Sequence, residues 1–290
     1  MASEDSNLIK DIKSKGFQGV RGNDDGLHTS LFGAIGGTTR NEGEHILNLE
    51  GSLLYKQGNM QFVNQTGMDR SYLYDVKYPG ELSESEHWIY GRVSNAYMQY
   101  SNSDIKLFLG RVARNWGTVA EQSLILSDNP YTYDHIQLSY NNSHIRLSIL
   151  ASQLNTENAL SYNAIDSTII PVQNVKRFLA THRLDIHLNS NLQLAFTETA
   201  IYGGQNATFD LSFLVPTNLY YDLQRNSDKP ISGLWAMDIY YKPKQNWQIY
   251  LQALIDDFII NNDPGIDDRA KHPNRLGMQF KVSNANVLFE

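Results

Sequence analysis

Residues 178–202 read FLATHRLDIHLNSNLQLAFTETAIY, and this stretch decides the fold. On both sides of the Asn-Ser-Asn at residues 189–191, apolar residues alternate with mostly polar ones. Alternation with a period of two is typical of a β-strand that has one apolar and one polar face. Asn and Ser suit the tight turn that joins two antiparallel strands. The stretch therefore predicts a β-hairpin.

The same alternation recurs along most of the chain, for example in residues 105–110 and 247–252. Apart from residues 5–15, no stretch has the apolar spacing of an amphipathic helix. We therefore expect an all-β antiparallel fold, with the start of a thirteenth strand at Val287. Twelve strands are predicted at residues 27–38, 46–56, 60–68, 88–100, 104–112, 133–140, 144–153, 178–188, 192–202, 233–242, 247–256 and 274–283.

The connections between the predicted strands alternate between short turns and long polar loops. In an up-and-down sheet, successive connections lie at opposite ends, so all the long loops gather at one end. Outer-membrane barrels have this asymmetry. The short turns are expected at residues 57–59, 101–103, 141–143, 189–191, 243–246 and 283–286, and the long loops at about 69–87, 113–132, 154–177, 203–232 and 257–273.

Aromatic residues gather near both ends of the predicted strands, as in the two aromatic belts of membrane proteins. Tyr140 and Trp247 lie beside short turns, and Tyr202 and Trp235 lie beside long loops. We predict an antiparallel, up-and-down transmembrane β-barrel. The alternative is a soluble β-sandwich or large soluble barrel, in which the apolar faces would point inward.

Composition excludes several classes of function. The 290 residues carry 24 basic and 31 acidic side chains, which gives a net charge of −7, and they include no cysteine. An acidic balance without Lys/Arg clusters argues against a nucleic-acid partner, because phosphate neutralisation supplies most of that affinity. The lack of cysteine excludes disulfides, Cys-ligated zinc and thiol nucleophiles. We expect neither a cofactor nor a metal.

We expect the chain to be a piece of a longer protein, without its signal peptide. The first ten residues contain no apolar stretch of the kind that signal peptides have. The predicted thirteenth strand is only half as long as the others, and bacterial single-chain barrels close with an even number of strands. We divide the chain into residues 1–26, a polar leader or the tail of a missing periplasmic segment, and residues 27–290, an incomplete barrel domain.

Six motifs, taken in order, resemble the signature of one protein family. Together they cover roughly residues 90–290 and resemble the capsule assembly (Wzi-like) outer-membrane proteins, in the branch found in Bacteroidetes-type bacteria. The motifs are LGRVARNWG at 109–117, LILSDNP at 124–130, RLDIHL at 183–188, ETAIYGG at 198–204, DDF at 256–258 and PNRLG at 273–277.

The resemblance implies an outer-membrane barrel of about eighteen strands with a small periplasmic helical bundle. It also implies a non-enzymatic role, in which the protein binds capsular polysaccharide and tethers it to the cell surface. We therefore expect surface polysaccharide and outer-membrane lipid as partners, a bacterial outer-membrane location and a monomer. The alternative function is a porin-like channel for small solutes. A wide lumen ringed by charges would favour the channel, whereas a filled lumen would favour the binder.

Arg111, Arg114 and Trp116, together with Asp128 and Asn129, form the first candidate group for glycan binding. Arg and Asn side chains can hydrogen-bond sugar hydroxyls and uronate carboxylates, and an indole can stack on a pyranose ring. The other interpretation is that arginine and aspartate pair inside the lumen and brace the loop at 113–132.

Arg183, Asp185 and His187 form the second candidate group. They alternate with Leu184 and Ile186, so with lipid outside they face the lumen. They predict either a glycan track or a cross-strand charge network that fills the interior. A His–Asp pair also suggests a hydrolase, but no G-x-S-x-G element is present to supply its serine. We expect no enzymatic activity.

Tyr202, Tyr220 and Tyr221 are the aromatic candidates around the loop at 203–232. Their rings could stack on sugars or pack the loop onto the barrel mouth. Glu198 is out of place, because alternation puts it with Phe196 on the lipid side, where a charge is costly near the midplane. Either a bulge shifts the register at Glu198, or this residue lies near the outer rim.

Overall fold

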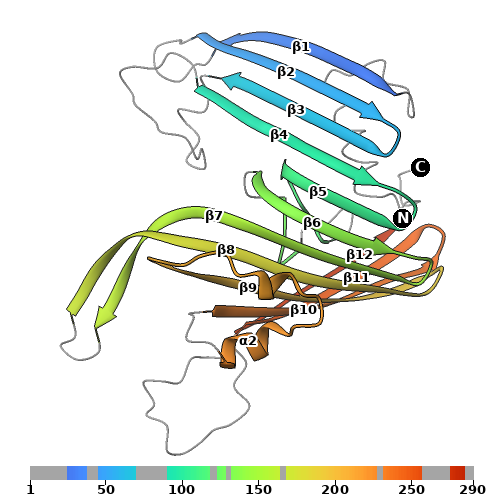
Figure 1. The fold of residues 1–290 in the computed structure, drawn as a ribbon. Helices are drawn as coiled ribbons and strands as arrows, with labels where there is room; N and C mark the ends of the chain where they lie inside the picture. Colours follow the sequence, from blue (N-terminus) through green and yellow to red (C-terminus); the bar gives the residue numbers. More distant parts are fainter. Residues whose placement is uncertain are drawn as a thin grey trace, which may run out of the picture. The chain divides into compact units, whose positions relative to one another are not determined.

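The computed structural model describes residues 25–37, 45–69, 90–117, 123–128, 132–163, 168–226, 231–256 and 275–284. These residues form a twelve-stranded sheet whose strands follow one another in sequence order (Figure 1). The predicted all-β, up-and-down antiparallel fold is confirmed. The strands are β1 (Gly26–Gly37), β2 (His45–Gln57), β3 (Met60–Asp69), β4 (Tyr90–Ser101), β5 (Ile105–Val112), β6 (Tyr133–Asn141), β7 (Ile145–Asn163), β8 (Thr168–Asn189), β9 (Leu192–Gly204), β10 (Ile231–Lys244), β11 (Trp247–Asp256) and β12 (Arg275–Asn284).

The chain divides into two compact units. The first contains β1 to β4 and most of β5, and the second contains most of β6 and all of β7 to β12. Residues 123–126, from the connection between β5 and β6, belong to the second unit. Most of the predicted leader at 1–26 and the predicted strand at Val287 lie outside the described residues. Among the described residues, no helix is long and apolar enough to cross a membrane.

Each unit has one face on which large apolar side chains are exposed. In the first unit, Leu107 and Leu109 of β5 are about half exposed, and in the second unit Phe196 and Met237 are similarly exposed. We call this side the apolar face and the opposite side the covered face. This arrangement is the reverse of the one expected for a soluble sandwich. On the covered face of the first unit lies a buried cluster of Leu54, Val63, Tyr97, Phe108 and Val112.

The predicted short turns are confirmed wherever the structure describes them. Gly58 has a positive φ of 54° between β2 and β3, as a tight turn at this point requires. Asn142 Oδ1 accepts hydrogen bonds from the backbone N–H groups of His144 and Ile145, both at 2.8 Å. The last predicted turn, at 283–286, lies mostly outside the described residues.

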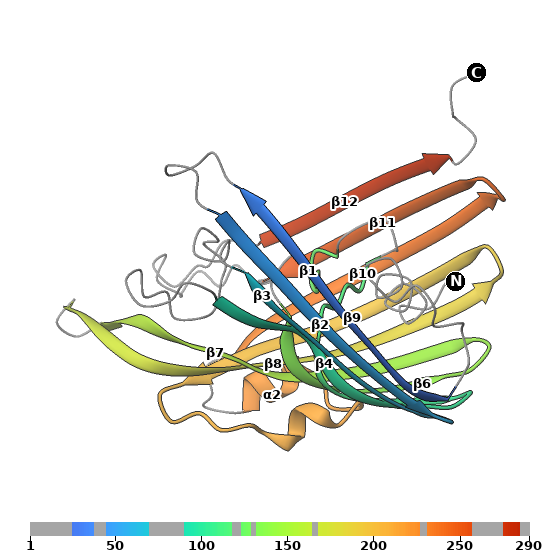
Figure 2. The ribbon, with the colours of Figure 1, turned by 90° about the horizontal axis from the view of Figure 1, so that it is seen from above.

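The prediction of a long loop at 154–177 is wrong, because β7 and β8 continue as a hairpin through most of these residues. Their pairing extends to Asn163 and Thr168, with register shifts between Leu154 and Ala159. Figure 2 shows the β7–β8 hairpin reaching beyond its neighbours. Two strands that satisfy each other's backbone hydrogen bonds need no apolar face, so the polar sequence here did not reveal them.

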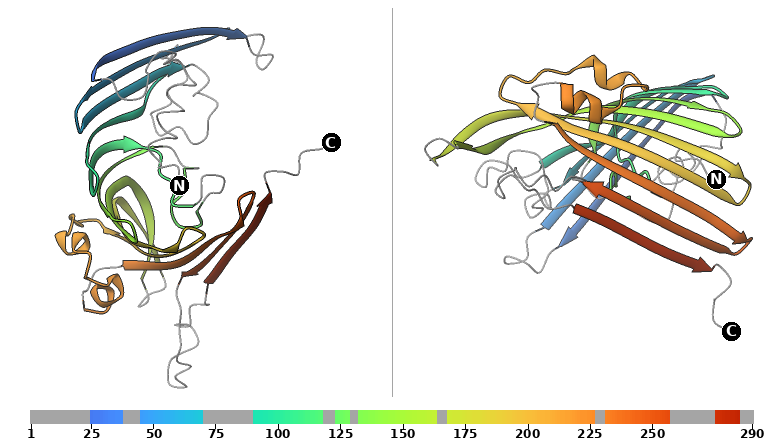
Figure 3. Two further views of the ribbon diagram at one scale, coloured as in Figure 1. Left: turned by 90° about the vertical axis from the view of Figure 1, so that its right-hand side faces the viewer. Right: turned by 90° about the horizontal axis from the view of Figure 1, so that it is seen from below.

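The predicted long connection between β9 and β10 contains two short helices. These are a 3₁₀ helix, η2 (Leu211–Leu214), and an α-helix, α2 (Tyr220–Asn226). The side chain of Asp210 caps η2 by accepting a hydrogen bond from the Ser212 backbone N–H at 2.9 Å. Figure 3 shows both helices lying on one side of the sheet.

Candidate functional site

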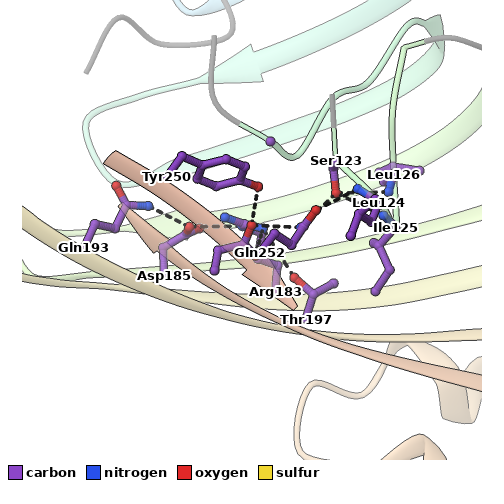
Figure 4. Close-up of polar contacts among 12 residues, drawn as sticks. Ser123, Leu124, Ile125, Leu126, Arg183, Asp185, Gln193, Thr197, Tyr250 and Gln252 are labelled. Atoms are coloured by element: carbon purple, nitrogen blue, oxygen red, sulfur yellow. Dashed lines mark hydrogen bonds and ion pairs between the residues drawn. The ribbon is translucent and has the colours of Figure 1, made fainter. Parts of the chain in front are cut away.

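Arg183 is the centre of a buried polar network on the covered face of the second unit. Its Nε lies 3.0 Å from Asp185 Oδ1, and its Nη1 lies 3.1 Å from Asp238 Oδ2. Nη1 also donates to Thr197 Oγ1 at 3.3 Å. Figure 4 shows the side chains of this network gathered on one side of the sheet. One guanidinium thus joins two carboxylates across three strands.

Asp238 extends the network to β11 and to a distant part of the chain. Tyr250 Oη and Gln252 Nε2 donate to Asp238 Oδ1 at 2.5 and 2.8 Å. Gln252 Nε2 also donates to Ser123 Oγ at 3.1 Å, and Gln252 Oε1 accepts from the Leu124 backbone N–H at 2.7 Å. The fully buried Gln252 therefore holds residues 123–126 against the covered face.

The chemistry of this network is that of a structural clamp. The Asp185 and Asp238 carboxylates both accept hydrogen bonds from protein donors, and buried charges need such partners. The network is the cross-strand charge network that the sequence offered as one of its two interpretations. His187 lies on the same face but nearer the short turn, where its backbone N–H donates to His144 O at 2.7 Å.

The first candidate group is divided between the two faces. Arg111 forms a bidentate ion pair with Asp134, with distances of 3.1 and 2.6 Å, on the apolar face. The Arg114 guanidinium is buried, with Cζ 4.1 Å from the centre of the Phe108 ring, and Trp116 is buried as well. Asp128 is exposed, and Asn129 lies outside the described residues. The sequence therefore grouped residues that the strand alternation separates.

Tyr202 and Tyr220 belong to a packed aromatic cluster on the apolar face. Tyr202 stacks on Phe213 of η2 with ring centres 4.2 Å apart, and Tyr220 Oη donates to Phe213 O at 2.9 Å. Burial raises the pKa of Tyr220, which lies in α2. Both rings are almost fully buried, so of the three predicted tyrosines only Tyr221 presents an exposed ring.

Glu198 keeps the strand register and is accommodated by two hydrogen bonds. It is opposite His182 on β8 and Trp235 on β10, with no register shift at this position. Its Oε1 accepts from the Tyr221 backbone N–H at 3.1 Å and from the Trp235 indole N–H at 3.0 Å. Of the two predicted explanations, the register shift is therefore absent, and the Glu198 carboxylate has partners from the loop and from β10.

A Ser–His contact exists, but at the short-turn end. Ser143 Oγ and His144 Nδ1 are 2.7 Å apart, and the two residues are adjacent in sequence and exposed. A serine hydrolase also needs a third group that orients the base. Among the hydrogen bonds of the described residues, no carboxylate fills that role for His144.

Sequence reasoning missed Asp238, Tyr250, Gln252 and Ser123. Asp238 stands between Met237 and Ile239 in a predicted strand, so its alternation did place it on the polar face. Nothing in the sequence indicated that it would reach Arg183, because the two lie 55 residues apart.

The sequence matches the family model described as capsule assembly protein Wzi over residues 38–278. The chain belongs to the Wzi capsule assembly family. No curated protein matches this Wzi-family sequence significantly. The predicted family is therefore confirmed by a match that spans most of the chain.

Several solved structures are similar to this Wzi-family chain at low identity. The NanC porin is 12% identical, with 89% of this chain and 99% of that chain covered and a TM-score of 0.35. OmpT, an outer membrane protein of Vibrio cholerae, is 8% identical, with 80% and 79% covered and a TM-score of 0.36. The outer membrane channel DcaP of Acinetobacter baumannii is 10% identical, with 80% and 79% covered and a TM-score of 0.33.

Proposed function

We propose that the protein is a non-enzymatic outer-membrane β-barrel that binds surface polysaccharide and keeps it at the cell. Membership of the Wzi capsule assembly family is the observation that carries this proposal. The role in capsule assembly is named for the family, and we extend it to this chain. We also propose that the protein works as a monomer.

The distribution of apolar side chains supports the membrane location. Exposed leucine, isoleucine, phenylalanine and methionine side chains lie on one face of each unit, and lipid is the solvent that makes such a face favourable. Tyr140, Tyr241 and Trp247 are partly exposed beside short turns, where an aromatic belt is expected.

The covered face of the second unit supports a binder in preference to a channel. A wide channel needs a polar wall that faces water. Here Arg183, Asp238 and Gln252 are bonded to one another or to common partners, and residues 123–126 lie over them. Side chains and backbone thus occupy the space in front of this part of the wall.

A shallow, open pocket at the long-loop ends of β8, β9 and β10 is the place where we propose that a sugar binds. Its volume is about 430 Å³, and Val175, Arg177, Ile201 and Ser232 are among its lining residues. Arg177 would pair with an acidic sugar, and the aliphatic side chains would cover the C–H face of the ring. Tyr221 is not part of this pocket, because its ring lies beside Trp235 on the apolar face.

Deletion of the gene in its own bacterium tests the proposal. The amounts of cell-bound and released surface polysaccharide are measured in the deletion strain and after complementation. We expect release into the medium without the gene, retention with the wild type and reduced retention with Arg177→Ala. Lys176→Ala is the matched control. Lys176 is basic and adjacent to Arg177 in sequence, but its side chain points to the opposite face of β8. Unchanged retention in the deletion strain, together with steady conductance of the purified protein in planar bilayers, would support a channel instead.

A further inference from the structure

Residues 205–226, which we call the covering segment, fold back over the apolar face of the second unit. They contain η2 and α2, and they bury the part of this face nearest the long loops. The buried cluster joins Phe178, Ala180, Ala200, Tyr202 and Ile231 of the strands to Phe213 and Tyr220 of the segment. Figure 3 shows the segment on the outside of strands β8 to β10.

The covering segment begins where the exposed apolar strip ends. Counting along β9 from the short turn at 189–191, Leu194 and Phe196 come first on the apolar face, and Phe196 is exposed. Glu198 is the first charged residue on that face, and it is bonded to the partly exposed Trp235. Tryptophan is enriched at the lipid–water boundary, where its indole N–H can be hydrogen-bonded. On the long-loop side of Glu198, Ala200 and Tyr202 of β9 lie under the covering segment.

The outward side of the covering segment carries exposed apolar side chains between residues 211 and 219, and the exposed Asp222 follows in α2. Leu211 is 71% exposed and Leu219 is 59% exposed, and Val215 is exposed between them. Residues 211–221 read LSFLVPTNLYY and contain no charged side chain. A segment that faced water on its outer side would be expected to carry charges there, whereas an element at a membrane boundary would not.

We propose that the covering segment is a lipid-contacting collar, in which Leu211, Val215 and Leu219 dip into the outer leaflet at the boundary of acyl chains and headgroups. The proposal rests on the outer-membrane location proposed above. The position of these side chains supports the proposal. The paired residues Phe196 and Met237 expose apolar side chains on the strands, and Leu211, Val215 and Leu219 continue this exposed apolar surface on the long-loop side of Glu198. The Glu198 carboxylate is held at this boundary by two hydrogen bonds, one from the Tyr221 N–H of the collar and one from the Trp235 indole of β10.

The absence of cysteine from the sequence makes a direct test possible, because any single introduced cysteine can carry a nitroxide label. The protein is reconstituted in phosphatidylcholine vesicles with a label at Leu211→Cys or Leu219→Cys. Met237→Cys, on the exposed strip, is the lipid reference, and Ser190→Cys, in a short turn, is the water reference. The collision rates of each label with oxygen, which concentrates in lipid, and with a nickel chelate, which stays in water, are compared.

We expect oxygen to dominate at residues 211, 219 and 237, and nickel to dominate at residue 190. Labels at 211 and 219 that behave like the one at 190, while 237 stays in lipid, would overturn the collar and leave the outer-membrane location intact. Labels at 211 and 219 that are shielded from both reagents and broadened by a second label would also overturn it, because a second copy would then cover the segment. A nickel-accessible label at 237 would overturn the membrane location itself.

Discussion

Arg183 and Asp238 form an ion pair at 3.1 Å although their strands, β8 and β10, are separated by β9. The guanidinium spans the intervening strand, whose Thr197 hydroxyl accepts a further hydrogen bond from the same nitrogen. Both side chains are buried, so the pair fixes the relative position of three strands rather than two. Its removal therefore has a consequence for stability that can be measured.

Asp238→Asn should destabilise the protein strongly. The change leaves the buried Arg183 with one carboxylate, and breaking a buried pair costs about 3–5 kcal/mol. The midpoint of thermal unfolding in detergent, followed by the loss of β-sheet circular dichroism, should fall. Asp134→Asn is the control, because its carboxylate is 67% exposed and such pairs are worth about 0–1 kcal/mol. Equal shifts in the two variants would contradict the role of Arg183 and Asp238 as a clamp.

Glu198→Ala should loosen the covering segment, because it leaves the Tyr221 N–H and the Trp235 indole without an acceptor. Of the two bonds, the one from the Tyr221 N–H reaches the segment, because Trp235 belongs to β10. The loss of that bond costs about 1 kcal/mol, so opening of the segment should become roughly fivefold more frequent. The rate of tryptic cleavage after Arg225 in the native protein measures this opening. Glu198→Gln keeps an acceptor oxygen and should be cut at nearly the wild-type rate. Equal rates for all three proteins would show that these hydrogen bonds do not hold the segment.

Tyr220 should make the covering segment sensitive to alkali. Burial raises the pKa of this tyrosine, so the folded state favours the neutral phenol. The stabilisation is fully present below the unfolded pKa of about 10 and is lost as the pH rises above it. Tyr220→Phe loses the hydrogen bond to Phe213 O, at a cost of about 1 kcal/mol, but also loses this dependence. The difference in unfolding temperature between wild type and variant should therefore shrink from about pH 8 to about pH 11. A constant difference would contradict the prediction.

Gly110→Ala should impair folding of the first unit. Gly110 has a φ of 134°, and a Cβ there would lie only 2.6 Å from Tyr97 Cα on the neighbouring strand. Strained backbone of this kind costs about 1–3 kcal/mol before the clash is counted. Gly51→Ala is the matched control, because a Cβ at Gly51 would meet no atom within 4 Å. The yield of heat-modifiable, folded protein in membranes should fall for Gly110→Ala and stay unchanged for Gly51→Ala. A fall in both would trace the effect to loss of glycine in general.

The strands and short turns could be predicted because their signals are local. The alternation of Ile105, Leu107 and Leu109 sets the two faces of β5 without reference to any other part of the chain, and Gln57-Gly58-Asn59 marks a turn by itself. The exposure of these apolar side chains follows the prediction for a barrel wall. The family could be recognised for a related reason, since its motifs are short and keep their order.

The tertiary contacts of the site could not be predicted in the same way. Asp238 reaches Arg183 only because the registers of two strand pairs align them, and Gln252 meets Ser123 across 129 residues. One local feature of the sequence indicated the covering segment, namely the charged Glu198 at a position that alternation assigns to the apolar face. A carboxylate in that position needs donors, and a search for them would have led to the loop that follows β9.

The β7–β8 hairpin has a consequence for how the sequence can change over time. Beyond Ser152 and Lys176, the two strands pair only with each other among the described pairings, so they form a two-stranded ribbon without lateral support. Such a ribbon is only marginally stable by itself, and its backbone pairing does not depend on particular side chains. Substitutions there would alter the ribbon without disturbing the strands at its base. We therefore expect this ribbon to be the described part of the protein most free to diverge between related bacteria.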